Sequence, residues 1–165
     1  MPFYLLVYGL ATIGAFAVVS QVREPAGERG VGAEATRLGQ WAGLGSRSPW
    51  LAGAMALFLL SFAGIPLTAG FVGKFVAFGA AIEAGGWPLV VVAVVASAAA
   101  AFFYVRIIVL MFLTPVPEDL ADNVVIGESV ATRSVIGFAA LFTLLIGLVP
   151  AGLLALAEDA AVLLP

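Results

Sequence analysis

Hydrophobic residues in this sequence form long continuous stretches instead of alternating with polar ones. Polar segments separate four such stretches, which cover residues 3–20, 50–84, 88–114 and 134–157. A helix that spans a bilayer needs roughly 20 consecutive apolar residues, and all four stretches approach or exceed that length. We therefore predict an all-α membrane protein with four transmembrane passes, which form a single membrane domain over residues 1–165.

The second stretch contains the turn-forming sequence GIPLTAG, so it is either two short passes or one pass broken at 64–69. Its halves, about 15 residues each, are individually too short to span a bilayer comfortably. One broken pass places the loops at 21–48 and 115–133 on the same side of the membrane. That side then carries five arginines: Arg23, Arg29, Arg37, Arg47 and Arg133. The positive-inside rule favours this arrangement, with both loops cytoplasmic.

Composition agrees with a membrane protein and excludes several kinds of site. Hydrophobic residues make up 63% of the chain and charged residues 10%, whereas a soluble domain is roughly a quarter charged. Cysteine and histidine are both absent, which excludes disulfides, thiolate metal sites and iron–sulfur ligation, and removes the commonest proton carrier. The net charge of -3, without a basic stripe, does not indicate binding to nucleic acid.

The motif SFAGIPLTAGFVGKF at 61–75 predicts a helix break inside the membrane. Pro66 has no amide hydrogen and crowds the preceding turn, while Gly64 and Gly70 allow unusual backbone angles. Thr68 is suitably placed as the N-cap of the second half-helix. The break leaves carbonyl groups of residues 62–65 without helical partners, which is tolerated in a bilayer only against protein or a water-filled cavity.

Lys74 lies in the second turn of the half-helix that follows this break. Burial and the positive end of the half-helix both disfavour the charged ammonium, so we expect a lysine that can lose and regain a proton. The free carbonyl groups could accept hydrogen bonds from its charged form. The alternative is structural: with two short passes, Lys74 would lie near the surface and extend its amine to the membrane interface.

Arg106 is a second charge inside a hydrophobic stretch, about two turns before the expected helix end at Leu113. It could extend to the cytoplasmic interface, which is the interpretation we favour, or it could pair with a carboxylate. Glu83, the acidic residue of the neighbouring segment, lies near the opposite end of the membrane.

The sequence GIPLTAGFVGKF resembles the signature of subunit N of the proton-pumping NADH:quinone oxidoreductase, respiratory complex I, and of its antiporter-like superfamily. The stretches YLLVYGLATIGAFAVVS, GLGSRSPWLAG and FFYVRIIVLMF resemble family sequences in the same order and spacing. The likeness covers essentially the whole chain. Family members have about fourteen helices, and this chain resembles helices eleven to fourteen. One mild departure is Pro66-Leu67, where the family motif often has two prolines.

This resemblance implies that Lys74 matches the family's lysine in the broken helix, a proton carrier toward the outer face of the membrane. It implies the broken-pass topology as well. In the family, the carboxylate and lysine of the first half-channel and the central lysine lie on earlier helices. Only the exit portion of the proton path would therefore belong to this sequence.

The resemblance also implies partners and location. The chain would be a multi-pass protein of the bacterial inner membrane and a subunit of a translocating oxidoreductase, beside complex I membrane subunits of the M, K and J types. Flavin, iron–sulfur clusters and quinone would belong to partner subunits, and this chain would hold no cofactor. Two alternatives remain: a subunit of a multisubunit cation/proton antiporter, and an inert membrane scaffold in which the motif is only a turn.

Overall fold

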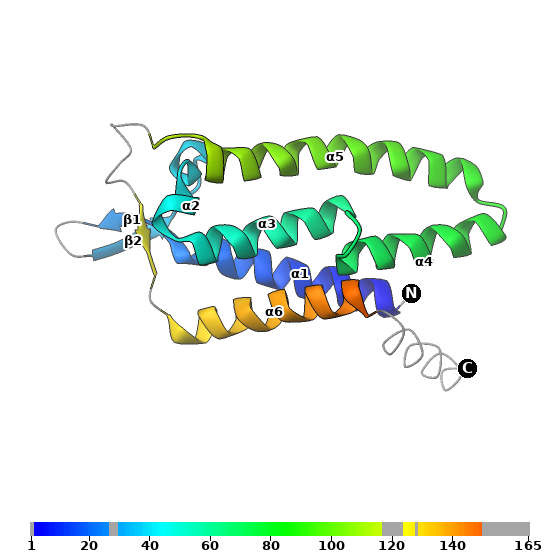
Figure 1. Ribbon diagram of the computed structural model, residues 1–165, viewed down its shortest axis with the longest axis horizontal. Coiled ribbons are helices and arrows are strands. Elements are labelled where there is room, and N and C mark those ends of the chain that lie inside the picture. Colours follow the sequence, from blue (N-terminus) through cyan, green and yellow to red (C-terminus); the bar gives the residue numbers. More distant parts are fainter. Residues whose placement is uncertain (1, 27–29, 117–123, 128, 150–165) are drawn as a thin grey trace.

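A computed structural model describes residues 2–26, 30–116, 124–127 and 129–149 of the protein. Five helices form its body and run roughly parallel or antiparallel to one another in a bundle (Figure 1). They are α1 (Pro2–Gln21), α3 (Pro49–Ala63), α4 (Ala69–Glu83), α5 (Trp87–Leu113) and α6 (Val130–Leu148). The shorter elements are β1 (Val22–Ala26), β2 (Gly30–Glu34), η1 (Leu38–Trp41), α2 (Leu44–Arg47) and β3 (Val125–Ile126).

The predicted passes are confirmed, including the broken second one. Helices α1, α5 and α6 are long and apolar enough to cross a membrane. Helices α3 and α4 have 15 residues each, about 22 Å of helix, which is less than the hydrocarbon thickness of roughly 30 Å. They follow each other along the bundle as two halves of one pass (Figure 1). The predicted fourth pass extends to residue 157, of which positions 150–157 lie outside the described residues.

A small three-stranded sheet joins the two polar loops at one end of the bundle (Figure 1). Strand β1 pairs with β2 in the first loop and also with β3 from the second loop, where Val22 lies opposite Ile126. Segments from both loops therefore meet on the same side of the protein, as one broken pass requires. The sequence did not predict these strands, because VREPA and GVGAE lack the apolar and polar alternation typical of a half-buried sheet.

Small residues allow the helices to pack closely around α1. A Cβ atom built on Gly14 would lie 2.8 Å from the Cβ atom of Ala139 in α6 and would overlap the ring of Phe58 in α3. Phe58 and Ala139 are themselves fully buried. Helix α5 lies at the edge of the bundle, and Met111 is the one residue of this helix that is fully buried among the described residues. Its apolar outer face would therefore contact lipid or another protein.

Candidate functional site

Helix α3 ends at Ala63, and the next residue, Gly64, adopts a left-handed conformation with φ +78°. The Gly64 amide donates to the carbonyl oxygens of Leu60 and Ser61 at 3.1 and 3.0 Å, and the amide of Ile65 donates to Leu60 at 3.1 Å. This is the pattern of a Schellman motif, in which backbone groups after the helix satisfy some of its last carbonyls. The carbonyl groups of the next two residues are left to find other partners.

Lys74 supplies those partners from the other half of the broken pass. Its Nζ atom donates to the carbonyl oxygen of Phe62 at 2.8 Å and to that of Ala63 at 3.1 Å. The absence of a side chain at Gly64 makes room for this contact, since a Cβ atom there would lie 2.9 Å from Lys74 Cδ. The ammonium thus caps α3 from α4, and it binds carbonyl groups within the range that the sequence predicted.

The turn between the helices contains Pro66, Leu67 and Thr68. Leu67 has a positive φ of 74°, which is uncommon for a residue with a side chain. Thr68 occupies the N-cap position of α4 with extended backbone angles, as the sequence suggested. Its hydroxyl does not cap an amide of α4, however, and donates instead to the carbonyl oxygen of Ile65 at 2.7 Å.

Ser61 caps α4, and sequence reasoning missed it. Its Oγ atom accepts a hydrogen bond from the amide of Gly70 at 3.0 Å, and the serine is only 1% exposed. A Cβ atom on Gly70 would overlap the carbonyl group of Ser61, so the two half-helices touch at this point. A polar residue one turn before a glycine-proline break was the signal in the sequence that could have indicated this contact.

Helix α6 covers one side of the break. A Cβ atom on Gly147 would overlap the carbonyl group of Leu67, which shows that α6 packs directly on the turn. Thr143 lies one helical turn earlier, is 1% exposed, and has no hydrogen-bond partner for its hydroxyl among the described residues. The interrupted backbone is therefore shielded by protein on this side, as a break at membrane depth requires.

The other side of Lys74 opens into a cavity of about 370 Å³ between α4 and α5. Lys74 is half-buried and lines this cavity together with Gly64. Ser97, on α5, is the other lining residue with a polar side chain. Such a volume exceeds that of a single water molecule, which occupies about 30 Å³ of the liquid. Water in the cavity could therefore reach the amine.

Arg106 lies elsewhere. It is exposed on α5 and lines a separate cavity with Leu38 and Gly39, which belong to η1 at the loop end of the bundle. Glu83 is the last residue of α4, whose end lies at the opposite end of the bundle from the β-sheet and the polar loops (Figure 1). The structure therefore does not bring Arg106 or Glu83 into the cavity that holds Lys74.

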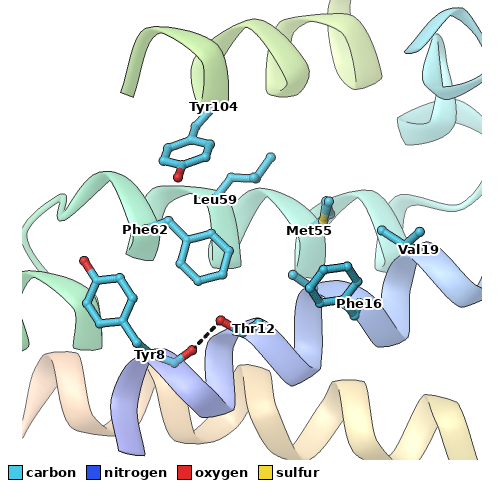
Figure 2. A pocket seen from close by; sticks show the side chains of 9 residues that line it. Tyr8, Thr12, Phe16, Val19, Met55, Leu59, Phe62 and Tyr104 are labelled. Carbon is cyan, nitrogen blue, oxygen red and sulfur yellow. Dashed lines mark hydrogen bonds between the residues drawn. The ribbon is translucent and has the colours of Figure 1, made fainter. Parts of the chain in front are cut away.

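A third cavity, of about 430 Å³, lies among α1, α3 and α5 (Figure 2). The rings of Tyr8, Phe62 and Tyr104 project into it from these three helices (Figure 2). Tyr8 and Phe62 have ring centroids 6.2 Å apart, and those of Phe62 and Tyr104 are 6.0 Å apart. Since the carbonyl group of Phe62 binds Lys74, this aromatic row reaches the helix break.

Within the described ranges, the structure contains no group of three or more carboxylate, imidazole or thiol side chains that could hold a metal ion. The polar groups of the site are instead the Lys74 amine, main-chain carbonyls, and the hydroxyls of Ser61, Thr68, Ser97 and Thr143.

Comparison with known proteins identifies the family. The family model described as NADH:quinone oxidoreductase/Mrp antiporter, transmembrane region, matches residues 1–115, which include the whole helix break and Lys74. The chain belongs to this family. It is a multi-pass membrane protein, in keeping with the spanning helices.

Curated relatives of this antiporter-like family share high sequence identity with the chain. NADH-quinone oxidoreductase subunit N of Rhodococcus opacus is 54% identical over 160 residues, which are 97% of this chain and 28% of that protein. Subunit N of Beutenbergia cavernae is 72% identical over 89 residues, which are 54% of this chain and 17% of that protein. The chain thus spans less than a third of the length of these relatives.

A solved structure shows the same fold. A chain of respiratory complex I from Thermus thermophilus, with bound aureothin, matches with a TM-score of 0.74 and 34% sequence identity. The match covers 90% of this chain and 31% of that chain. The arrangement of passes described above is therefore that of part of an antiporter-like membrane subunit.

Proposed function

We propose that this chain forms part of the proton-translocating subunit N of an NADH:quinone oxidoreductase, with Lys74 as a proton carrier on the exit side. The observation that carries the proposal is the pair of hydrogen bonds from Lys74 Nζ to Phe62 and Ala63 across the helix break. Intramembrane lysines are rare and usually functional, and this one lies beside main-chain groups that stabilise its charged form. We assign the chain to this complex because its relatives are named NADH-quinone oxidoreductase subunit N.

The proposed transfer uses the chemistry of the amine and its surroundings. An ammonium has three N–H donors, and the two carbonyl groups of α3 engage two of them. The third donor is free to bond water in the cavity between α4 and α5. Loss of a proton to that water would leave a neutral amine that still has hydrogens for the carbonyls. Both protonation states would therefore keep partners within the same site.

Electron transfer would take place on other subunits. Flavin, iron–sulfur clusters and quinone would be held by partner subunits. Within the membrane, the neighbours of this chain would be complex I subunits of the M, K and J types. We place the chain in the bacterial inner membrane with segments 21–48 and 115–133 in the cytoplasm. The arginines of these segments support that orientation through the positive-inside rule, because the sheet gathers both segments at one end.

An alternative is a subunit of a multisubunit cation/proton antiporter, since the family description includes Mrp antiporters. The identity of 54% over nearly the whole chain favours subunit N of the oxidoreductase. Copurification of iron–sulfur subunits with the chain would support the oxidoreductase, whereas their absence from an intact purified complex would support the antiporter.

The second alternative is a scaffold in which Lys74 only caps α3. The proposal predicts that Lys74→Ala severely lowers NADH-driven proton uptake by inverted membrane vesicles, measured per assembled complex. Lys74→Arg should keep part of the rate, because arginine retains a charge and donors for the carbonyl groups. The scaffold predicts that an assembled Lys74→Ala complex translocates protons at the parent rate, and that result would exclude our proposal.

A further inference from the structure

A buried serine ties the two halves of the broken pass together. Ser61, in the last turn of α3, accepts a hydrogen bond at 3.0 Å from the amide of Gly70, in the first turn of α4. The first amides of a helix lack partners within it, and a capping side chain normally precedes the helix in sequence. Here the cap comes from the other half-helix, nine positions away.

The same two helical turns carry the proton-transfer site. Gly70 and Lys74 are four residues apart in α4, so they lie on one face of that helix. A long side chain in a helix extends back toward the N-terminus, and Lys74 thereby reaches the end of α3. The carbonyl groups that it binds belong to Phe62 and Ala63, the two residues that follow Ser61. A shift of α4 against α3 would therefore stretch the Ser61 contact and the Lys74 contacts together.

We propose that Ser61 is a positioning residue, which holds Gly70 and thereby places the Lys74 ammonium on the carbonyl groups of Phe62 and Ala63. The inference rests on the proposed function, because the placement of Lys74 affects transport only if Lys74 carries the proton.

Two further observations support this role. Thr68 occupies the usual capping position, but its hydroxyl donates to Ile65, so it does not replace Ser61 at the Gly70 amide. Gly70 also has no space for a side chain against the Ser61 carbonyl group, which fixes how closely the helices approach. Removing the serine hydroxyl would leave the buried Gly70 amide without its partner, and the start of α4 would move to find another.

The test uses inverted membrane vesicles whose complex contains this sequence in subunit N, with proton uptake measured per assembled complex over a range of pH. Ser61→Ala removes the acceptor, Ser61→Cys keeps the volume with a much weaker acceptor, and Ser61→Thr keeps the hydroxyl. Ser134→Ala is the matched control, because that exposed serine donates to the carbonyl group of Val130 in its own helix and, within the described part of the chain, does not contact the helix break.

We expect Ser61→Ala and Ser61→Cys to lower the rate about three- to tenfold, the effect of losing one buried hydrogen bond. They should also change the pH at which the rate is half-maximal, while Ser61→Thr and Ser134→Ala keep the parent rate and pH profile. An assembled Ser61→Cys complex with parent behaviour overturns the inference. The inference is also overturned if the Ser61→Thr complex is as slow as the Ser61→Ala complex. It is overturned as well if the proton-uptake rate falls only in proportion to the amount of assembled complex.

Lys74→Ala, measured in parallel, separates this inference from the proposed function. If Lys74→Ala translocates protons at the parent rate, the proposed function is wrong, and positioning by Ser61 has no role in transport. If Lys74→Ala abolishes transport while Ser61→Cys leaves it intact, only the positioning role is wrong.

Discussion

Lys74 Nζ, in α4, lies 2.8 Å from the carbonyl oxygen of Phe62, in α3. This bond joins the two halves of one transmembrane pass across the turn that separates them. Hydrogen bonds with a charged donor are stronger than neutral ones, and they gain further strength where water is sparse. The break supplies acceptors for the lysine, and the lysine satisfies groups that the break exposes. Each feature therefore makes the other tolerable within the membrane.

Gly64 should be required for this contact. We expect Gly64→Ala to lower the free energy of unfolding by about 1–2 kcal/mol, because a side chain is strained at positive φ. The added methyl group would also displace Lys74, so proton uptake should fall. Thermal unfolding of the purified complex measures the first effect.

Gly53→Ala is the control for this substitution within the same helix. No atom from another part of the described chain lies within 4 Å of a Cβ atom built at Gly53, and alanine is a better helix former than glycine. It should leave stability unchanged or slightly higher. Equal behaviour of Gly53→Ala and Gly64→Ala would show that the left-handed turn and the space beside Lys74 do not matter.

Arg106 should contribute little to proton transfer, although it is also a charge within a membrane helix. It is exposed and lines a cavity at the loop end, away from the cavity of Lys74. We expect Arg106→Gln to keep proton uptake within about twofold of the parent, as for an exposed charge. A loss as large as that of Lys74→Ala would place Arg106 on the proton path.

The orientation of the loops can be tested with cysteine labelling, because the chain has no cysteine of its own. Thr36→Cys introduces a thiol on the exposed part of the first loop, and Ala84→Cys introduces one at the opposite end of the bundle. A membrane-impermeant maleimide should label Thr36→Cys in inverted vesicles and Ala84→Cys in intact spheroplasts. The reverse pattern would place the arginine-rich loops outside the cytoplasm.

The sequence predicted the helix break and the acceptors of Lys74 because both follow from local chemistry. Proline kinks or breaks a helix, glycine favours its end, and the last carbonyl groups of an interrupted helix have no partners within that helix. The lysine a few residues later was the nearest charged donor in the sequence. The structure places Pro66 in the turn and directs Lys74 to Phe62 and Ala63, within the predicted range.

The contacts that the sequence could not predict depend on how the chain turns in three dimensions. Ser61 meets Gly70 only because the turn at residues 64–68 brings the ends of α3 and α4 together. Gly147 packs on Leu67 from a helix about 80 positions later. Strand β3 reaches β1 from the second loop, and two residues of strand carry no detectable pattern. None of these partners can be read from spacing alone.

The most direct test of the central claim separates the capping role of Lys74 from proton transfer. Lys74→Gln keeps an N–H donor for the carbonyl groups of α3 but cannot ionise. The account predicts that the complex assembles in normal amount while NADH-driven proton uptake in inverted vesicles falls at least about tenfold, the scale of losing general acid–base transfer. Proton uptake at the parent rate by an assembled Lys74→Gln complex would contradict it.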